Sequence, residues 1–454
     1  MKTKKVRTNE KMISMPVVNP HAAGIDIGSK SHFVCVSQDN VKEFGAFTSD
    51  LYDIVNHLQK HQVKTVAIES TGFYWQSLFV ILQENEFEVF LVNSRHLKNV
   101  KGHKTDVVDS RWLQLMHSIG MLTNSFQPDA FTLELRNYVR HRKSLVEDAS
   151  RFVSKMNKVM VLMNIRLSTV LRDITGESGL KVIKAILDGE RNPAKLEELI
   201  SYRCKTSRGD IQKSLQGDWR KEYLFELRDC YEFYQYYWAK IRNIDTEIEH
   251  LIEEHAKQTT HEVSNKDYKA PKKKFHQKND PEFSVEKYAY EMTSGVDLLQ
   301  IDGVGINTVL TMMSETGFDI SKKFQTAKHF ASWLGFTPNR RISGGKELSS
   351  KTRKKTNPLA KIIRDAANAA GNSKSRLGDF FKRLAYRKGR MVAIIATARK
   401  IAVIIFNMLT KRESYCYEFS EAETEKIKNV KIQKVLKALK SYNISKNDLD
   451  FAWA

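Results

Sequence analysis

Residues 22–37 read AAGIDIGSKSHFVCVS, and the architecture of the first part of the chain can be worked out from them. Two apolar strands, residues 23–27 and 32–37, flank a Gly-Ser turn, and residues 43–48 continue as a third short strand. Beyond them the spacing of apolar residues alternates between helix and strand: helix 51–60, strand 65–69, helix 74–83 and strand 87–92. Three hairpin-like strands followed by such alternation predict a mixed α/β layer.

Acidic residues occupy unusual places in this α/β pattern, which is typical of a ribonuclease-H-like domain. Asp26 stands within a strand between Ile25 and Ile27, where a carboxylate is costly to bury unless it is paired or binds a metal ion. Glu69 ends the strand TVAIE, and Asp106 and Asp109 are three residues apart, which places them on one face of a helix. Carboxylates that converge from separate elements suit hard divalent cations and two-metal phosphoryl chemistry. Taken singly, Glu69 could be a turn acid, Asp106 a helix cap and Asp109 a surface acid.

The middle of the chain has two apolar seams with heptad spacing, at residues 145–163 and 227–251. They predict two long helices that pair as an antiparallel hairpin or across subunits, with short helices between them. Tyr234, Tyr236 and Tyr237 on the second seam suit a core more than base stacking. The expected domains are a basic arm (1–20), an α/β domain (21–128), a coiled-coil domain (129–256), a flexible basic linker (257–285), a mostly helical domain (286–410) and a tail (411–454) with one amphipathic segment at 427–439.

Composition limits the possible partners. The 454 residues carry 74 Lys and Arg against 53 Asp and Glu, a surplus of +21, and 41% are hydrophobic, so a largely disordered chain is excluded. Residues 338–400 hold 18 Lys and Arg against three acids, so this segment alone contributes +15. Such a concentration favours nucleic acid over a merely soluble surface or a membrane. Four scattered cysteines fit a reducing cytosol, and we expect neither a transmembrane span nor a signal peptide.

Two glycine-containing segments lie in the basic half. Residues 298–308 resemble a helix–hairpin–helix element, in which Gly303 and Gly305 would let backbone N–H groups approach phosphates; a plain joint between helices is the alternative. Ser343 precedes two glycines, so its hydroxyl can protrude, and nearby cations could stabilise a phosphorane-like transition state. From spacing alone, a flexible phosphate-binding turn in which Ser343 only forms hydrogen bonds is the favoured interpretation, and Ser349, Ser350 and Thr352 are nearby alternatives. The cations proposed to contact nucleic acid are Arg340, Arg341, Lys346, Lys351, Arg353, Lys354 and Lys355.

These motifs together resemble the DEDD transposases of bridge-RNA-guided insertion sequences. The resemblance rests on GIDIGSK, AIESTGFYW, KTDVVDSRWLQLMHS, IDGVGINTVLTMMSETG, FASWLGFTPNRRISGGKE and MVAIIATARKIAVIIFNML, and spans nearly the whole chain. It implies that the family's four acids are Asp26, Glu69, Asp106 and Asp109, and that its nucleophilic serine is Ser343. Many relatives have two adjacent serines where this chain has Ile342-Ser343, and Thr356-Asn357 replaces a common Gly before Asn or Asp.

The resemblance also implies an assembly and a reaction. A RuvC-like domain would be joined through a coiled coil to a serine-bearing transposase domain, in homotetramers built as two dimers. Mg²⁺, or alternatively Mn²⁺, would assist cleavage through a covalent serine–DNA intermediate, and a structured noncoding guide (bridge) RNA would pair with donor and target DNA. The expected location is cytoplasmic and nucleoid-associated, in a prokaryote. A metal-dependent nuclease resembling a junction resolvase and a non-catalytic nucleic-acid scaffold are the alternatives.

Overall fold

The computed structural model describes residues 16–70, 72–93, 105–125, 127–259, 277–352, 357–413, 415 and 421–441. The chain forms two compact units, Met1–Gln127 and Pro128–Ala454, and the sequence analysis placed a boundary after residue 128. Several expectations lie outside the described residues: the first fifteen residues of the basic arm, most of the linker, the last part of the tail, and Arg353, Lys354 and Lys355.

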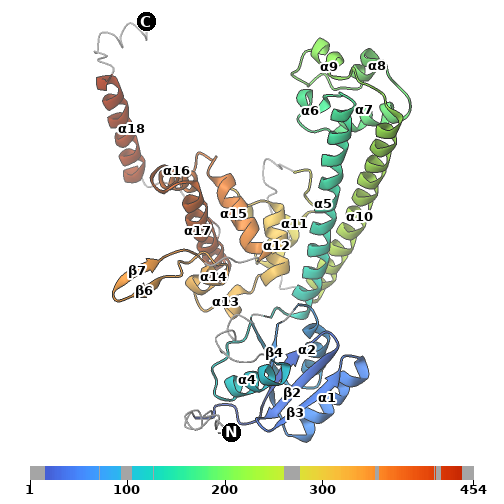
Figure 1. Cartoon of the computed structure of the whole chain (residues 1–454). Helices are drawn as coiled ribbons and strands as arrows, with labels where there is room; N and C mark the ends of the chain where they lie inside the picture. The colour runs from blue at the N-terminus through green and yellow to red at the C-terminus, as the bar shows by residue number, and fades with distance from the viewer. Residues whose placement is uncertain are drawn as a thin grey trace, which may run out of the picture. The chain divides into compact units, whose positions relative to one another are not determined.

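The first unit is built on a five-stranded mixed sheet of order β3-β2-β1-β4-β5 (Figure 1). Its strands are β1 (Ala22–Ile27), β2 (Ser31–Ser37), β3 (Asn40–Gly45), β4 (Thr65–Glu69) and β5 (Glu88–Val92). The central strand β1 pairs antiparallel with β2 and parallel with β4, and β5 continues parallel to β4. The expected hairpin-like strands followed by alternating helix and strand are therefore confirmed.

Helices cover both faces of this sheet. They are α1 (Thr48–Lys60), α2 (Trp75–Glu84) and α4 (Asp106–Ser118). On one face, Ile25 and Ile68 pack in a core with Ile54 of α1 and Leu78 of α2. On the other face, Ala67 and Val92 pack with Leu113 of α4. Because side chains alternate along a strand, the residues facing α4 are every second one.

Two boundaries differ from the sequence expectation. The third strand ends at Gly45, and Thr48 already belongs to α1, because the Asp50 carboxylate accepts a hydrogen bond from the Phe47 N–H at 3.0 Å and begins the helix there. The end of the expected basic arm is also held in place. The backbone N–H groups of Val18 and Asn19 donate to the Ser118 carbonyl at 2.8 and 2.9 Å.

The second unit begins with the predicted pair of long helices, α5 (Ala130–Leu162) and α10 (Lys221–Thr259), which pack against each other within the chain. Met156 and Val159 of α5 share a core with Leu227 and Tyr234 of α10. The hairpin arrangement and the core role of Tyr234 are thus confirmed, whereas Tyr236 is exposed. The short helices between them are α6 (Leu167–Val170), α7 (Glu177–Leu187), α8 (Pro193–Glu198) and α9 (Arg208–Ser214).

A helical domain with one small hairpin completes the second unit. Its helices are α11 (Val285–Met292), the 3₁₀ turn η2 (Leu298–Gln300), α12 (Ile306–Thr316), α13 (Ile320–Lys323), α14 (Ala327–Trp333), α15 (Pro358–Ala370), α16 (Arg376–Lys388), α17 (Arg390–Lys411) and, in the tail, α18 (Glu421–Ser441). Strands β6 (Arg341–Ser343) and β7 (Lys346–Ser349) form the hairpin. The linker expectation is wrong for residues 277–285, because Phe283 and Val285 are buried in the core of this domain.

Helix α17 bears on the expectation that the chain has no transmembrane span. Within the described part of the chain, α17 is the one helix that is long and apolar enough to cross a membrane. Inside the protein, 44% of its apolar 18-residue stretch is buried. Its buried residues include Ile401 and Ile405, which pack in the core with residues of α14 and α15. A core helix passes the same test, so this is weak evidence for a membrane span.

Buried arginines fix the coiled coil to its surroundings. Arg142 of α5 forms a two-pronged ion pair with Asp245 of α10, and both side chains are about 95% buried. Its third nitrogen, Nη1, donates to the Asn279 carbonyl at 3.1 Å, which holds the residues after α10 against the hairpin. The Arg142 guanidinium therefore connects α5, α10 and the segment around Asn279 that precedes α11.

Removing the Arg142 side chain should be far more costly than removing an exposed arginine of the same helix. Arg142→Met leaves the Asp245 carboxylate buried without its counter-charge, and we expect the free energy of unfolding to fall by about 3–5 kcal/mol in urea titrations. Arg151→Met, which removes an exposed pair with Asp148, should change it by less than about 1 kcal/mol. The double variant Arg142→Met/Asp245→Leu should recover part of the loss; equal costs for the Arg142 and Arg151 variants would contradict this interpretation.

His117 is a buried, neutral contact between α4 and the sheet. Its Nε2 is hydrogen-bonded to the Thr65 hydroxyl at 2.8 Å, and its ring lies 4.7 Å from that of Phe90 between centroids. Burial lowers the pKa of His117 from 6.5 to about 4. Protonation would place an uncompensated charge in this interior, so the folded unit resists it.

This lowered pKa predicts acid sensitivity of the first unit. Between pH 6.5 and 4 the unfolded chain binds a proton at His117 that the folded chain does not, so the contribution is complete above pH 6.5 and is lost as pH falls, up to about 3 kcal/mol. Unfolding free energies at pH 7 and pH 5 should therefore differ more in the natural protein than in His117→Gln, which keeps a polar group but does not titrate. Identical pH dependence in the two proteins would show that His117 is not responsible.

Candidate functional site

The sheet register places Asp26 and Glu69 side by side. The parallel pairing of β1 with β4 runs from Ala22 opposite Thr65 to Ile25 opposite Ile68. One step further along both strands lie Asp26 and Glu69. Side chains at the same register position of neighbouring strands point to the same face, with strands about 4.8 Å apart. Both residues are partly buried, as their places at the strand ends require.

Helix α4 covers the face to which these two carboxylates point. Gly24, two residues before Asp26, is in direct contact with the helix backbone: a Cβ at Gly24 would lie 2.3 Å from the Gln114 nitrogen and 2.7 Å from the Ser110 carbonyl oxygen. Since residues two apart on a strand share a face, Asp26 also faces the α4 side. The glycine is required here because any larger residue would push the helix off the strand.

The direction of α4 brings its first turn toward the acids. Helix α4 runs opposite in direction to β1 and β4. At the start of these strands, the Gln114 side-chain amide donates to the Ala22 carbonyl, and the Thr65 hydroxyl is hydrogen-bonded to His117 near the end of the helix. Ala67 then shares a core with Leu113, four residues earlier in the helix. The same progression points the next turn, which contains Asp109, toward Glu69.

The start of α4 settles one alternative for Asp106. Thr105 is the N-cap, because its hydroxyl accepts a hydrogen bond from the Val108 N–H at 3.3 Å. The suggestion that Asp106 itself caps the helix is therefore wrong. Asp106 is the first helical residue and is exposed, whereas Asp109 is partly buried. Both carboxylates lie in the first turn, where the helix dipole favours negative charge.

The structure does not draw these four carboxylates to a single point. Among the described residues, no three His, Cys, Asp or Glu side chains lie close enough together to hold a metal ion. Asp26 and Glu69 belong to the sheet, and Asp106 and Asp109 belong to α4, which packs on the same face of that sheet. The donor set itself fits a hard divalent cation, since it consists of carboxylate oxygens.

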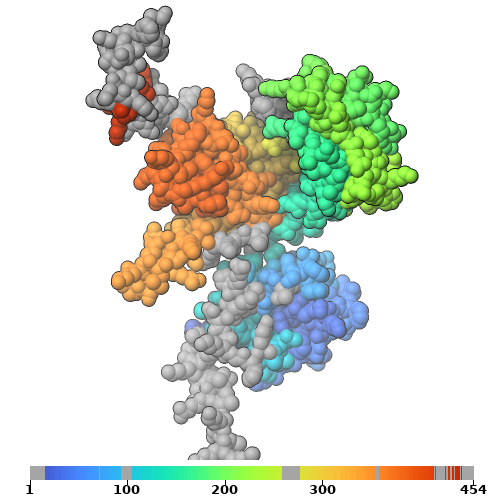
Figure 2. Space-filling model, turned by 45° about the horizontal axis from the view of Figure 1, so that its top comes forward, coloured from blue at the N-terminus to red at the C-terminus, as the bar shows by residue number. Residues whose placement is uncertain are grey.

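Ser343 stands near the tip of the β6–β7 hairpin, a local structure that the sequence analysis expected only as a turn. Gly344 and Gly345 have φ of +56° and +76°, the left-handed values that a two-residue hairpin turn requires. Ser343 pairs with Lys346 across the turn, so its hydroxyl and the lysine ammonium share one face of the ribbon. Figures 1 and 2 show this hairpin standing out from the helices of its own unit.

Exposure of the hairpin agrees with the prediction that the serine hydroxyl protrudes. Ser343 and its neighbours Arg340, Arg341 and Lys346 are all exposed. A Cβ at either glycine of the turn would meet no atom within 4 Å. The base of the hairpin is held by the Asn339 N–H, which donates to the Lys351 carbonyl at 3.1 Å. A hydroxyl flanked by cations is thus exposed to solvent.

The helix–hairpin–helix-like segment divides into two parts. Gly303 has φ of +83°, and a Cβ there would lie 2.1 Å from the Ala366 carbonyl oxygen, so this glycine serves close packing on α15. Gly305 is the N-cap of α12 and has open space around its Cα. The packing contact explains Gly303, and Gly305 alone keeps the geometry expected for phosphate contact.

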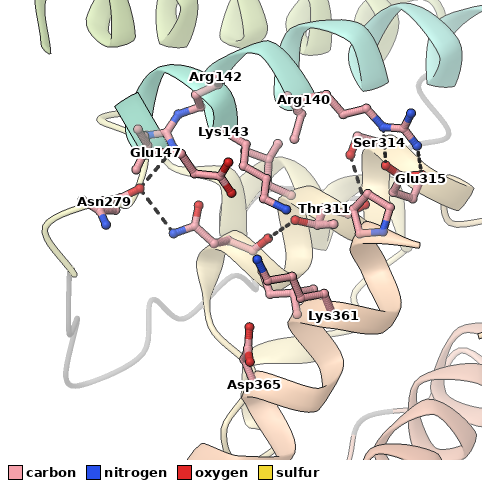
Figure 3. A pocket seen from close by; sticks show the side chains of 16 residues that line it. Arg140, Arg142, Lys143, Glu147, Asn279, Thr311, Ser314, Glu315, Lys361 and Asp365 are labelled. Atoms are coloured by element: carbon pink, nitrogen blue, oxygen red, sulfur yellow. Dashed lines mark hydrogen bonds and ion pairs between the residues drawn. The ribbon is translucent and has the colours of Figure 1, made fainter. Parts of the chain in front are cut away.

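A cavity of about 250 Å³ lies between α5, α12 and α15 (Figure 3). Arg140 spans one side of it, where Nε and Nη2 each donate to a Glu315 carboxylate oxygen at 2.9 Å. The walls carry both signs of charge, from Lys143, Glu147, Lys361 and Asp365. None of the predicted site residues is among those that line it, and its mixed charge gives it no preference for an anion.

The sequence analysis missed the arginine contacts that surround this cavity. Arg136 donates to the Ser314 and Glu315 carbonyls at 3.2 and 2.7 Å and so satisfies the open end of α12. Arg136 and Arg140 are four residues apart on one face of α5, which is a detectable signal. Their partner, Glu315, is 175 residues away from Arg140 in the chain, and no local pattern identifies it.

Comparisons with known proteins match the two parts of the chain that hold these features. Residues 23–165 match the DEDD transposase domain of the IS110 type, and residues 297–382 match the transposase family described as IS116/IS110/IS902. A transposase of insertion sequence element IS1111A from Coxiella burnetii is 29% identical over 120 residues, which are 25% of this chain. The match spans 32% of that relative's own length.

The first match contains Asp26, Glu69, Asp106 and Asp109, and the second contains Ser343 and both glycines of the helix–hairpin–helix-like segment. The four acids lie in the first compact unit and within the first family match. Ser343 lies in the second unit and within the second match. The chain therefore carries both transposase domains of the IS110 type of insertion sequence.

Proposed function

We propose that this chain is an insertion-sequence transposase/recombinase that cuts and rejoins DNA strands under the guidance of a structured noncoding RNA. The observation that carries the proposal is the pairing of two features: carboxylates on the α4 face of a β3-β2-β1-β4-β5 sheet, and an exposed serine on a cationic hairpin. This strand order and the central acid-bearing strand support a RuvC-like, ribonuclease-H-like assignment for the first unit. The two family matches support transposition as the activity.

The proposed chemistry conserves phosphodiester bonds. The Ser343 Oγ attacks the phosphorus of a DNA strand and passes its proton to a general base, while the deoxyribose oxygen that leaves takes up a proton and becomes a free hydroxyl. A hydroxyl of the partner strand then attacks the phosphorus of the serine–DNA phosphodiester and gives up its proton, while the Ser343 oxygen leaves and takes up a proton. Because each step exchanges one phosphodiester for another, no nucleotide hydrolysis is needed to drive rejoining.

Cations of the hairpin have a defined part in this step. Lys346 lies opposite Ser343, and Arg340 and Arg341 precede it, so positive charge surrounds the place where the phosphorane forms. Such charge stabilises the transition state more than the ground state, because negative charge increases on the equatorial oxygens. Asp26, Glu69, Asp106 and Asp109 would hold Mg²⁺ or Mn²⁺, which when bound polarises phosphoryl oxygens and offsets their charge.

The acids and the serine lie on different units, which supports a composite site. In the proposed assembly, two dimers form a homotetramer, and the acidic face of one subunit meets the serine hairpin of another. An exposed hairpin without a packed tip suits insertion into such a partner. Guide-RNA and DNA binding are supported by the +15 charge of residues 338–400, which favours backbone contacts over base readout.

Replacement of Ser343 tests the covalent step. We expect Ser343→Ala to lower recombination by about 10³-fold or more and to eliminate the protein–DNA adduct on denaturing gels, because the proposal assigns the nucleophile to this hydroxyl alone. Ser350→Ala, a nearby exposed serine, is the matched control and should keep both. Cleavage that survives Ser343→Ala and leaves hydrolysed ends would favour a nuclease of the junction-resolvase type.

Replacement of the sheet acids tests the metal site. Asp26→Asn and Glu69→Gln keep size and shape but remove the charge, so both should lose Mg²⁺-dependent cleavage and should weaken Mg²⁺ binding in calorimetric titrations. Asp39→Asn, an exposed acid in the β2–β3 turn, should behave like the natural protein. Chelation of divalent ions should stop cleavage in every variant; full activity of Asp26→Asn in Mg²⁺ would remove the carboxylates from the mechanism.

A further inference from the structure

Helix α16 carries a row of cations that the proposed recombination chemistry does not use. Residues 376–390 contain six Lys and Arg against one acid, Asp379. Arg376, Arg383 and Arg387 are spaced by seven and four residues, which places them on one face of the helix. That face is about 16 Å long from the first to the last of them, at 1.5 Å per residue.

Helix α17 adds a further cation, Lys400, beside this row of α16. Its Lys400 ammonium lies 4.3 Å from the centroid of the Phe380 ring, and Phe380 stands between Arg376 and Arg383 on α16. Burial and then the charges of Arg376 and Arg383 lower the pKa of Lys400, so the three cations act on one another. Helix packing therefore places Lys400 beside the α16 arginines, and the exposed cations Lys400, Arg383 and Arg387 are here called the cationic stripe.

An almost fully exposed aromatic ring adjoins the stripe. Tyr386 is 94% exposed and lies next to Arg387, one turn after Arg383. Lys388, Arg390, Met391 and Val392, around the Gly389 joint between α16 and α17, are exposed as well. Aromatic rings interleaved with cations have the chemistry to stack on bases while the cations neutralise phosphates.

We propose that the α16–α17 hairpin binds an unpaired nucleic-acid strand, with the cationic stripe along its phosphates and Tyr386 stacked on a base. Phosphate contacts alone would serve a duplex equally well, but the Tyr386 ring can stack only on a base whose face is uncovered. Loops of a guide RNA and DNA strands opened during exchange share this chemistry. The inference requires nucleic acid as a partner and does not depend on the serine or metal chemistry.

Binding is best measured with the full chain carrying Ser343→Ala and with divalent ions chelated, so that no reaction takes place. The probes are a short oligo(dT), an oligo(U) of equal length and a duplex of equal length, each followed by fluorescence anisotropy. Tyr386→Ala should weaken binding to a single-stranded probe roughly five- to a hundredfold while affecting the duplex little. Tyr386→Phe should retain the affinity, because stacking needs the ring and not the hydroxyl.

The stripe is tested by its salt dependence. Arg383→Gln/Arg387→Gln should reduce the slope of log affinity against log salt by about 1.4, two phosphate contacts at 0.7 each for a single strand. Tyr202→Ala and Arg151→Gln/Arg203→Gln replace an exposed tyrosine and two arginines of the coiled-coil domain and serve as matched controls. The probe that loses more affinity in Tyr386→Ala, DNA or RNA, identifies the strand.

Three results would overturn the proposal. Tyr386→Ala could bind both single-stranded probes as tightly as Tyr202→Ala does. It could lose duplex and single-stranded binding equally, which would show that the surface attracts nucleic acid by charge alone and has no preference for unpaired strands. A polyglutamate peptide could compete as well as oligo(dT), which would assign the stripe to an acidic protein. Because all of these are binding measurements, they remain informative even if Ser343 proves not to be a nucleophile.

Discussion

The absence of a side chain at Gly24 allows the first unit to form its acidic face. Helix α4 rests directly on the backbone of the central strand, and a single methyl group at Gly24 would collide with the Ser110 and Gln114 backbone. This close contact sets how deeply the helix lies on the sheet. The position of the helix in turn determines where its first turn, with Asp106 and Asp109, stands relative to Asp26 and Glu69.

Around that contact, the α4 layer combines apolar and neutral polar pairs. Leu113 packs with Ala67, and the neutral His117 ring meets Thr65. Leu113 and His117 lie one and two helical turns after Asp109 along α4. Neither side chain carries a charge at neutral pH. The four candidate carboxylates lie at the strand ends and at the start of α4.

The second unit is organised by a different force, the cost of burying charge without a partner. Arg142 and Asp245 cross the coiled coil in its interior, and Arg136 and Arg140 close the end of α12. These contacts make the coiled coil and the helical domain one compact unit. The Ser343 hairpin and most of the α16–α17 cations are exposed on the surface of this unit.

The sequence by itself determined the elements and their chemistry. Alternation of apolar residues located every strand of the five-stranded sheet, heptad spacing located α5 and α10, and the residue types marked Asp26, Glu69, Asp106, Asp109 and Ser343 as candidates. These are local signals, because a strand or helix repeats its buried face every two or every three to four residues. Boundaries moved where a side chain acted on a nearby backbone group, as Asp50 and Thr105 do.

Only the tertiary structure decided which of these residues meet. It paired Asp26 with Glu69 by register, set Gly303 against α15 and not against solvent, drew Lys400 between two arginines, and joined Arg140 to Glu315. Among the described residues, it brought no three His, Cys, Asp or Glu side chains close enough together to hold a metal ion. No periodic pattern encodes such encounters, because each depends on the packing of elements that are distant in the chain, and packing follows shape and burial in three dimensions.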